Sequence, residues 1–394
     1  MRVCLISTAH DGRDDRLYFK EARSLAKEHE VTLLAPTLHE GSVWQDEKIR
    51  FKRLNSSLKK TSRLLMVLRL LCGLQRGCCD VIHVTDTEMY PFLPMLKWRT
   101  GAKIVCDIWE ADYELIIGPN EAPSLIRKLV AGAVRAMERW VARRCDLVLT
   151  ADAAIAESLG PDVSATVIYN YPLLSALAVA EADVARLRRE FGQRRCVIYH
   201  GSMAEERGVL AAVEAMGYVR DVNPDATLVL VGRMPERLEE AVQRTVARLG
   251  LGDAVRCIVW VDYSEVGGYL AVSEIGLVPF ARTRKFEKNI PQKIFEYWAA
   301  GLPVIGTDLA PIRYYVSRCG GGVLTESNDP VVLSRAVVAL LEQPEMARCM
   351  GQRGKAMVEE VWRWECMEDK LLAAYRALGD DRSAAHLLGP RHFP

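Results

Sequence analysis

The chain has 394 residues, of which 50% are hydrophobic and 26% are charged, and its formal net charge is +1. This length predicts two domains, each large enough for its own core. The ordinary composition excludes a disordered chain, and the near-zero charge gives no reason to expect a nucleic-acid partner. No apolar run approaches the roughly 20 residues that a membrane-spanning helix needs.

The cysteines indicate the compartment. Their number is 11, which is odd, and they form no CxxC pair and no zinc-ligand spacing. This usage is typical of a reducing environment, and residues 1–7 lack the pattern of a signal peptide. We therefore expect a cytoplasmic protein.

The first part of the chain alternates apolar runs with helical patterns. Residues 3–7 and 31–35 indicate buried strands of a parallel sheet, and the spacing within 17–26 indicates an amphipathic helix between them. The other expected elements are strands at 48–54, 81–84, 103–106, 147–150 and 166–169, and helices at 64–74 and 125–142. This alternation predicts a doubly wound α/β domain.

A second series of the same kind follows a break at residues 170–172. Its expected strands are 196–201, 227–231, 255–259, 275–279, 303–306 and 321–324. We therefore expect α/β domains at 1–172 and 173–361. A separate helix is expected at 362–378, followed by a flexible tail at 379–394.

The stretch 289–303 carries the clearest chemistry. Pro291 stands near the start of a helical pattern, and Gly301 stands where a left-handed cap would end it. Lys293 and Glu296 therefore fall at the start of a helix, where unpaired N–H groups and the dipole favour an anion. The stretch predicts a site for phosphate and sugar.

Five motifs resemble those of GT-B glycosyltransferases of the retaining family 4, and they occur in the family's order. They are DDRLYFKEARSL at 14–25, DIWE at 107–110, YHGS at 199–202 with the pair Arg207-Gly208, NIPQKIFEYWAAGLP at 289–303, and Trp364-Glu365. The resemblance covers the chain to about residue 378. It implies two Rossmann-like domains facing each other across a cleft, with the C-terminal helix returning to the N-terminal domain. It also places the acceptor on the first domain and the nucleotide-sugar donor on the second.

The resemblance implies specific donor contacts. Glu296 would bind the ribose hydroxyls, whereas Lys293 and Arg207 would bind the diphosphate. Gly201 and Gly232 follow strands and would allow close approach of the nucleotide, although ordinary strand-to-loop turns also explain them.

The loop before this helix departs from the family pattern. Lys288 stands where the first glutamate of the family's Glu-x7-Glu element is expected. Glu287 and Asn289 flank that position, and Ile290 follows. These three residues are the expected donor-sugar contacts.

Candidate residues of the first domain follow its strands. Asp107 and Glu110 would carry polar contacts to the acceptor or the reacting sugar, because Trp109 replaces a histidine found in relatives. His10 is a further catalytic candidate from the first βα loop. Ordinary helix capping is the alternative for Asp107 and Glu110. The acceptor-side candidates are Asp11, Gly12, Asp14 and Trp109, and His83 and Asp86 follow the next strand as further candidates.

The implied reaction is sugar transfer with retention, in which the leaving diphosphate takes the acceptor proton. Such enzymes are generally metal-independent, and the sequence contains no Asp-x-Asp carboxylate cluster, so no metal and no cofactor are expected. The acceptor would be a saccharide or a lipid-linked molecule of the cell surface. Residues 48–76 contain nine basic residues and no acidic one, which favours peripheral contact with anionic membrane lipids; a core helix with a basic collar is the alternative.

Two other functions fit the same pattern. A hydrolysing sugar-nucleotide epimerase shares the fold and needs no acceptor. A degenerate, non-catalytic binding subunit is suggested by the replacements at Trp109 and Lys288, whereas retention of Arg207, Lys293 and Glu296 argues against it.

Overall fold

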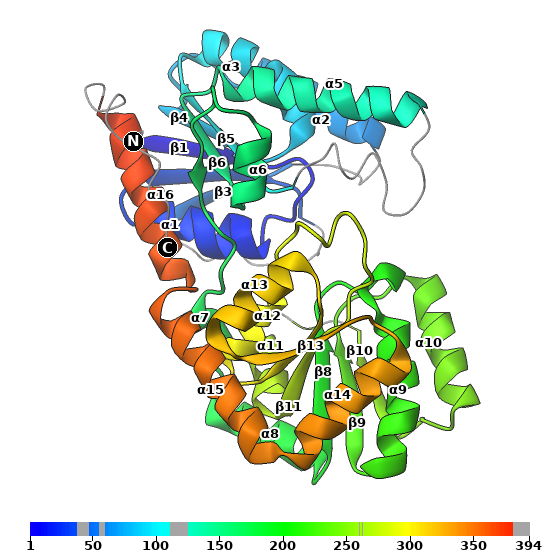
Figure 1. The fold of residues 1–394 in the computed structure, drawn as a ribbon. Helices are drawn as coiled ribbons and strands as arrows, with labels where there is room; N and C mark the ends of the chain where they lie inside the picture. The colour runs from blue at the N-terminus through cyan, green and yellow to red at the C-terminus, as the bar shows by residue number, and fades with distance from the viewer. Residues whose placement is uncertain (38–46, 55–59, 111–124, 260, 262, 381–394) are drawn as a thin grey trace. The chain divides into compact units, whose positions relative to one another are not determined.

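The computed structural model describes the chain apart from residues 38–46, 55–59, 111–124, 260, 262 and 381–394, which include most of the expected tail. The chain forms two compact units (Figure 1). Unit 1 contains residues 1–170 and 364–394, and unit 2 contains residues 171–363.

Unit 1 is built on seven parallel strands in the order β3-β2-β1-β4-β5-β6-β7. The strands are β1 Arg2–Ile6, β2 Glu30–Ala35, β3 Ile49–Arg53, β4 Val81–Val84, β5 Lys103–Ile108, β6 Leu147–Thr150 and β7 Thr166–Val167. The inner strands are buried on both faces, and for that reason they form continuous apolar runs in the sequence. The prediction of a doubly wound parallel domain is confirmed.

Helices cover the faces of this sheet. They are α2 Lys60–Gly73, the 3-10 helix η2 Thr87–Phe92, α3 Leu93–Thr100, α5 Leu125–Ala142, α6 Ala153–Ser158 and α16 Trp364–Gly379, with η1 and α1 defined below. Side chains from α2, α3, α5 and α6 share one apolar core with the strands. Within the described residues, no helix is both long and apolar enough to cross a membrane.

The first helical segment differs from the α-helix expected at 17–26. Asp15–Ala22 (η1) is a π-helix, and only Arg23–Leu25 (α1) is α-helical. Two ion pairs join residues five positions apart, Arg16 to Glu21 and Lys20 to Asp15, at 2.6 Å each. The π-helix repeats its hydrogen bonds at this spacing, so the buried charges match the winding.

The C-terminal helix α16 belongs to unit 1. The Trp364 indole N–H donates to Ser24 Oγ at 2.9 Å, and the Tyr375 hydroxyl lies 2.7 Å from His83 Nδ1. The Lys103 ammonium donates to the carbonyl of Leu378 at 2.7 Å. The expected return of the last helix to the first domain is therefore confirmed.

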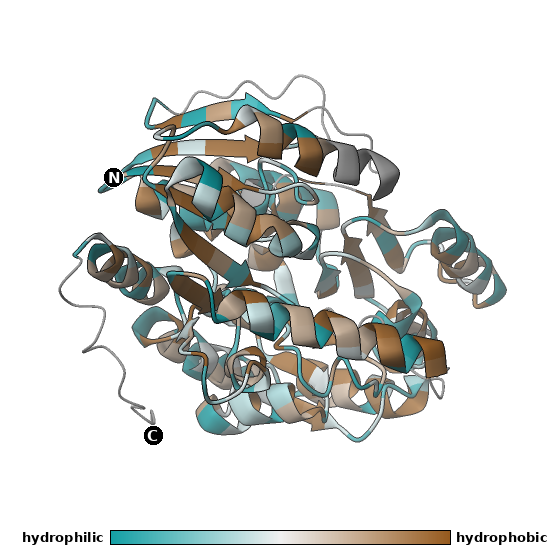
Figure 2. Ribbon diagram, turned by 90° about the horizontal axis from the view of Figure 1, so that it is seen from above, coloured by the Kyte–Doolittle hydropathy of each residue, from teal (hydrophilic) through white to brown (hydrophobic). Residues whose placement is uncertain are grey.

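Unit 2 is built on six parallel strands in the order β10-β9-β8-β11-β12-β13. They are β8 Arg195–His200, β9 Ala226–Val231, β10 Val255–Ile258, β11 Ser273–Val278, β12 Val304–Thr307 and β13 Gly322–Thr325. The helices are α7 Leu174–Leu177, α8 Glu181–Phe191, η3 Glu205–Arg207, α9 Val209–Val222, α10 Glu236–Arg248, α11 Tyr263–Ala271, α12 Lys293–Ala299, α13 Ala310–Cys319, α14 Pro330–Glu342 and α15 Pro344–Glu360. Figure 2 shows most strands as hydrophobic, whereas the helices carry both hydrophobic and hydrophilic residues.

The strand orders identify where ligands are expected. Each sheet reverses its direction of growth beside its first strand, between β1 and β4 in unit 1 and between β8 and β11 in unit 2. Open α/β sheets bind ligands at the carboxyl ends of strands, at such a switch point. The loops after these four strands are therefore the places to search for a site.

Candidate functional site

In unit 2 the loops after β8 and β11 meet the start of α12. Lys293 is the first residue of α12, and it is 6% exposed. Its ammonium nitrogen lies 3.7 Å from the centre of the Tyr199 ring and 5.3 Å from that of Phe280. Within the described residues this nitrogen has no hydrogen-bond partner.

Burial, and then the nearby charge of Arg207, hold the pKa of Lys293 well below its usual value, while Glu296 partly opposes them. A bound anion would stabilise the charged form of this amine, because it supplies a negative charge and hydrogen-bond acceptors. The helix has only seven residues, so the positive charge of the site comes from the side chains rather than from the helix dipole.

Arg207 supplies the second cation. It ends η3, directly after the β8 loop, and its guanidinium donates to the carbonyl of Ser202 at 3.2 Å. The next residue, Gly208, has a φ of 74°, and a Cβ there would lie 1.8 Å from the carbonyl oxygen of Pro279. This glycine therefore lets the Arg207 turn approach the end of β11.

Glu296 lies one turn after Lys293 and is buried. Its carboxylate is 3.1 Å from His200 Nε2, and Gln292 Nε2 donates to it at 3.5 Å. The Tyr297 hydroxyl accepts from the His200 backbone N–H and donates to the carbonyl of Leu277, at 3.2 Å each. These bonds fix the end of β8 against α12. His200 belongs to the YHGS motif at 199–202, but the sequence pattern did not indicate this contact with Glu296.

Glycine occupies the two positions 201 and 232 of the site for different structural reasons. Gly201, at φ 98°, faces the Lys293 ammonium, and a Cβ there would lie 3.8 Å from that nitrogen. Gly232, at φ 137°, is required by chain packing, because its Cβ would lie 2.2 Å from the Gly201 carbonyl oxygen. Only Gly201 therefore keeps the space next to Lys293 clear.

The loop before α12 holds the predicted sugar contacts. Glu287 forms an ion pair with Arg282 and also accepts from the backbone N–H of Ala310 at 3.3 Å. The backbone N–H of Asn289 donates to the carbonyl of Lys285 at 2.9 Å, and Ile290 is partly exposed. The Glu287 carboxylate therefore already has a cationic partner, which sequence spacing did not indicate.

In unit 1 the loop after β1 meets the end of β4. Asp86 is buried, and its carboxylate accepts from the Ser7 hydroxyl at 2.8 Å and the Thr8 backbone N–H at 2.5 Å. His10 lies close to this carboxylate. Its Nε2 is 3.7 Å from Asp86 Oδ1, and its Nδ1 is 3.9 Å from Asp14 Oδ2. Burial raises the pKa values of both carboxyls, although His10 partly opposes this. His10 and Asp86 therefore lie together at the switch point.

Asp107 has a different environment from the one predicted. It is fully buried, the Arg16 guanidinium lies 3.1 Å from it, and the Trp109 indole N–H donates to it at 2.6 Å. Burial alone would raise the pKa of Asp107, but the Arg16 charge and then His83 hold it below its usual value. Asp107 is thus enclosed and positions Trp109, whose ring centre lies 4.5 Å from that of His10.

Three further candidates have local roles. Asp14 caps η1, accepting from the backbone N–H groups of Arg16 at 2.9 Å and Leu17 at 3.1 Å. Asp11 accepts from the Arg13 backbone N–H at 2.8 Å, and the Gly12 N–H donates to the Pro36 carbonyl at 2.8 Å. These bonds shape the loop that carries His10. Glu110 is exposed at the edge of the described part of the chain.

Glu21, His83 and Asp107 are grouped closely enough for one metal ion, as judged over the described residues. However, the Arg16 guanidinium bonds to both carboxylates, at 2.6 Å to Glu21 and 3.1 Å to Asp107. Arg16, Glu21 and Asp107 therefore form an ion-pair network, and His83 Nε2 lies 3.7 Å from Glu21 Oε2 and 3.5 Å from Asp107 Oδ2.

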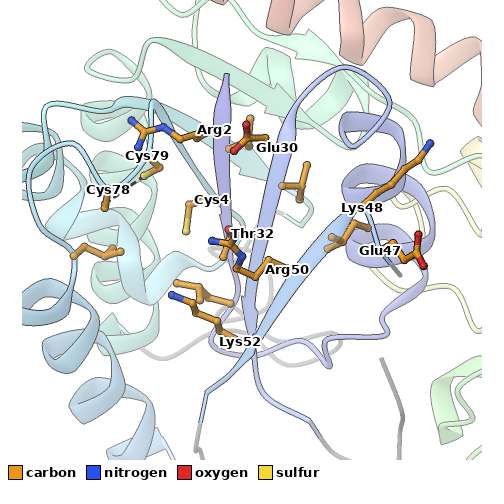
Figure 3. Close-up of a pocket in the computed structure, with 15 residues that line it drawn as sticks. Arg2, Cys4, Glu30, Thr32, Glu47, Lys48, Arg50, Lys52, Cys78 and Cys79 are labelled. Carbon is orange, nitrogen blue, oxygen red and sulfur yellow. Dashed lines mark hydrogen bonds between the residues drawn. The ribbon is translucent and has the colours of Figure 1, made fainter. Parts of the chain in front are cut away.

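A separate cavity of about 540 Å³ lies against β1, β2 and β3 (Figure 3). Its polar lining includes the basic residues Arg2, Lys48, Arg50 and Lys52, the acidic residues Glu30 and Glu47, and three cysteines, Cys4, Cys78 and Cys79. The basic stretch 48–76 contributes Lys48, Arg50 and Lys52 to this lining, which lacks the residues of the switch point. Residues 55–59 of that stretch lie outside the described residues.

Comparisons with known proteins identify the relatives of both units. Residues 194–343 match the family described as "Glycosyl transferases group 1", and residues 20–171 match the "Glycosyl transferase 4-like domain". An alpha-D-kanosaminyltransferase of Streptomyces kanamyceticus is 24% identical over 80% of the chain and 82% of that relative. A GDP-mannose-dependent phosphatidylinositol monomannoside mannosyltransferase of Corynebacterium glutamicum is 28% identical over 43% of the chain and 44% of that relative.

Solved structures share the fold. Sucrose-phosphate synthase of Thermosynechococcus elongatus has a TM-score of 0.76 at 17% identity, covering 96% of this chain and 99% of that one. The Anabaena protein HepE, solved with UDP-glucose, has a TM-score of 0.74 at 13% identity, covering 95% and 99%. At these identities the likeness concerns the fold alone.

Proposed function

Because the chain belongs to the group 1 glycosyl transferases of GT-B fold, we propose that it transfers a sugar from a nucleoside-diphosphate sugar to an acceptor. The observation that carries this proposal is the buried Lys293 ammonium at the switch point of unit 2, which has no hydrogen-bond partner among the described residues. Arg207 lies near it in the β8 loop, and Glu296 lies one helical turn away.

Each side chain has a role in this proposal. Lys293 and Arg207 bind the diphosphate and stabilise the charge that develops as it leaves. Gly201 keeps the space beside Lys293 open. Glu296, oriented by His200, accepts hydrogen bonds from the ribose hydroxyls. Retention requires that the diphosphate leaves from the face on which the acceptor attacks, where it can take the acceptor proton. Lys293 and Arg207 take the place of a metal ion in this proposal, because they stabilise the charge of the diphosphate.

The acceptor side is assigned to the switch point of unit 1. His10, with one ring nitrogen near Asp86 and the other near Asp14, can donate to or accept from an acceptor hydroxyl. Asp107 acts indirectly in this proposal, because it holds Trp109 against His10. We assign Asp107 a positioning role and leave Glu110 as an exposed candidate for acceptor contact.

We further propose that the acceptor is lipid-linked and that the enzyme works peripherally at the inner face of the cell membrane. Basic side chains of the stretch 48–76, among them Arg50 and Lys52, support this proposal because they line an open cavity on unit 1. The relatives' names include both a phosphatidylinositol monomannoside and 2-deoxystreptamine, so the acceptor must be tested directly.

The proposal is tested by binding and transfer together. Calorimetry with UDP, GDP, ADP and their sugars should give one preferred base, and the matching labelled sugar should move to a lipid extract or a saccharide. The variant Lys293→Met should lose binding, whereas Lys355→Met, which removes a lysine on α15, should keep it. Epimerised sugar without transfer would show an epimerase, and absence of all binding would contradict the proposal.

A further inference from the structure

Helix α5 carries its large apolar side chains on the solvent side. Leu125, Ile126, Leu129 and Val130 are 74%, 73%, 66% and 46% exposed. Their spacing places them on one side of the first two turns. The buried positions of the helix are instead Ala131, Glu138, Val141 and Ala142. An amphipathic helix normally turns its apolar stripe toward the core, so this arrangement requires another partner for the stripe.

The charged side chains of residues 125–144 are mostly basic, and one of them, Arg143, pairs with Asp162 at 3.2 Å. Residues 125–144 contain six basic side chains and one acidic one. The acid, Glu138, is 3% exposed, so it does not offset the cations at the surface. Lys128 is exposed within the apolar turns, where its long stem can lie along apolar surface while its ammonium stays at the boundary. Apolar side chains flanked by lysine and arginine are typical of helices that lie in a membrane interface.

Other helices of unit 1 also carry exposed apolar side chains. They are Leu68 of α2 and Met95 and Trp98 of α3. Both helices share one core with the C-terminal end of α5, where Val141 and Ala142 are buried. Trp98, at 84% exposure, is a residue type that is enriched where bilayer and water meet.

Charge decides between a membrane and a second copy of the chain. A symmetric dimer through this face would bring two strongly basic helices together, and the repulsion would oppose the apolar contact. An anionic lipid surface satisfies both features, because its acyl boundary accepts the leucines and its headgroups attract the cations.

The position of α5 also suits a lipid-linked acceptor. The helix contacts η2, which begins directly after Asp86 at the switch point of unit 1. The apolar stripe is therefore on a helix that adjoins the edge to which we assigned the acceptor.

We infer that unit 1 docks on an anionic membrane through the first two turns of α5, with Leu125, Ile126, Leu129 and Val130 inserted among the headgroups. The role of this contact in bringing the enzyme to its acceptor rests on the proposed function, but the binding test does not depend on that function. Helix α5 lies outside the basic stretch 48–76, so this contact is additional to the one proposed for that stretch.

The test is flotation of the full chain with vesicles of phosphatidylcholine alone or with 30% phosphatidylglycerol. We expect binding only to the anionic vesicles, weakened by salt. Leu125→Ser with Leu129→Ser should reduce it roughly tenfold or more. Val222→Ser with Val259→Ser, which removes two exposed apolar side chains of unit 2, should not. Lys128→Glu should reduce it roughly fivefold or more.

Two outcomes would overturn the inference: no binding to anionic vesicles, or equal binding by the leucine and control variants. Hydrogen exchange gives an independent reading, because vesicles should protect residues 125–130 from exchange. Exchange that is unchanged by anionic vesicles counts as absence of binding in this test. Nucleotide binding is measured on the same samples, so failure of docking and failure of the proposed transfer are distinguished.

Discussion

The ammonium nitrogen of Lys293 lies 3.7 Å from the centre of the Tyr199 ring, in a buried position where no described residue accepts a hydrogen bond from it. The ring face offsets part of the cost of burying this charge. The remaining cost is recovered only when an anion binds, and the predictions for the donor site follow from this relationship.

Lys293→Met should weaken binding of a nucleoside diphosphate while leaving the fold intact or more stable. The methionine keeps the apolar stem and removes a charge whose burial is costly. We expect an affinity loss of about tenfold to a hundredfold, from lost charge-assisted hydrogen bonds. Calorimetry and thermal unfolding measure the two effects. A large loss of stability with unchanged affinity would contradict the assignment.

Binding of the diphosphate should take up a proton. Burial and Arg207 hold the pKa of Lys293 well below its usual value in the free protein, and a bound anion raises it again. The affinity should therefore fall as pH rises through the free-state pKa. Titrations in two buffers of different ionisation enthalpy count the proton, and Lys293→Met should abolish the uptake. Uptake that persists in this variant would assign it to another group.

The same lowered pKa has a consequence for folding. The folded chain binds fewer protons at Lys293 than the unfolded chain does, so the contribution of this residue to stability rises with pH, up to about pH 10.4. The free energy of unfolding, measured with urea at several pH values below this limit, should rise less steeply with pH for Lys293→Met than for the original protein. Identical slopes would contradict the lowered pKa.

Glu296→Gln should discriminate between nucleotides. If the carboxylate binds the ribose hydroxyls, the change weakens a ribonucleoside diphosphate by about tenfold but leaves its 2′,3′-dideoxy analogue nearly unaffected. His200 is 3.1 Å from this carboxylate, so His200→Gln should act in the same direction. An equal loss for both nucleotides would indicate that Glu296 only supports the fold.

The ion-pair network of unit 1 gives a matched pair of variants. The Arg16 charge helps to hold the pKa of Asp107 below its usual value, whereas burial, and then Asp107, raise that of Glu21 well above its own. The charged form is therefore favoured more at Asp107 than at Glu21. Asp107→Asn should lower the free energy of unfolding by about 3–5 kcal/mol at pH 7, and Glu21→Gln by clearly less. Equal costs in urea unfolding would contradict this division.

The sequence predicted the sheets because buried parallel strands form short continuous apolar runs, as β4 and β9 do. The resemblance implied that Lys293, Glu296 and Arg207 bind one donor, and the structure places the elements that carry them at the switch point of unit 2. The π-helix was missed, because its apolar spacing over so few turns resembles that of an α-helix.

The partners of the buried charges were not predictable, since they lie far apart in the chain. Arg16 and Asp107 are 91 positions apart, and His83 and Tyr375 are 292 apart. Pairings over such distances leave no local pattern. For this reason Asp107 was predicted to contact substrate directly, whereas the structure encloses it.

The most direct measurement incubates the chain with a panel of labelled nucleotide-sugars, in the presence of lipid extract and of saccharides, and follows the label. We predict that one donor transfers its label to an acceptor with release of the nucleoside diphosphate, and that Lys293→Met abolishes this transfer while Lys355→Met retains it. Absence of transfer from every donor, with no nucleotide bound at Lys293, would contradict the assignment of this chain as a glycosyltransferase.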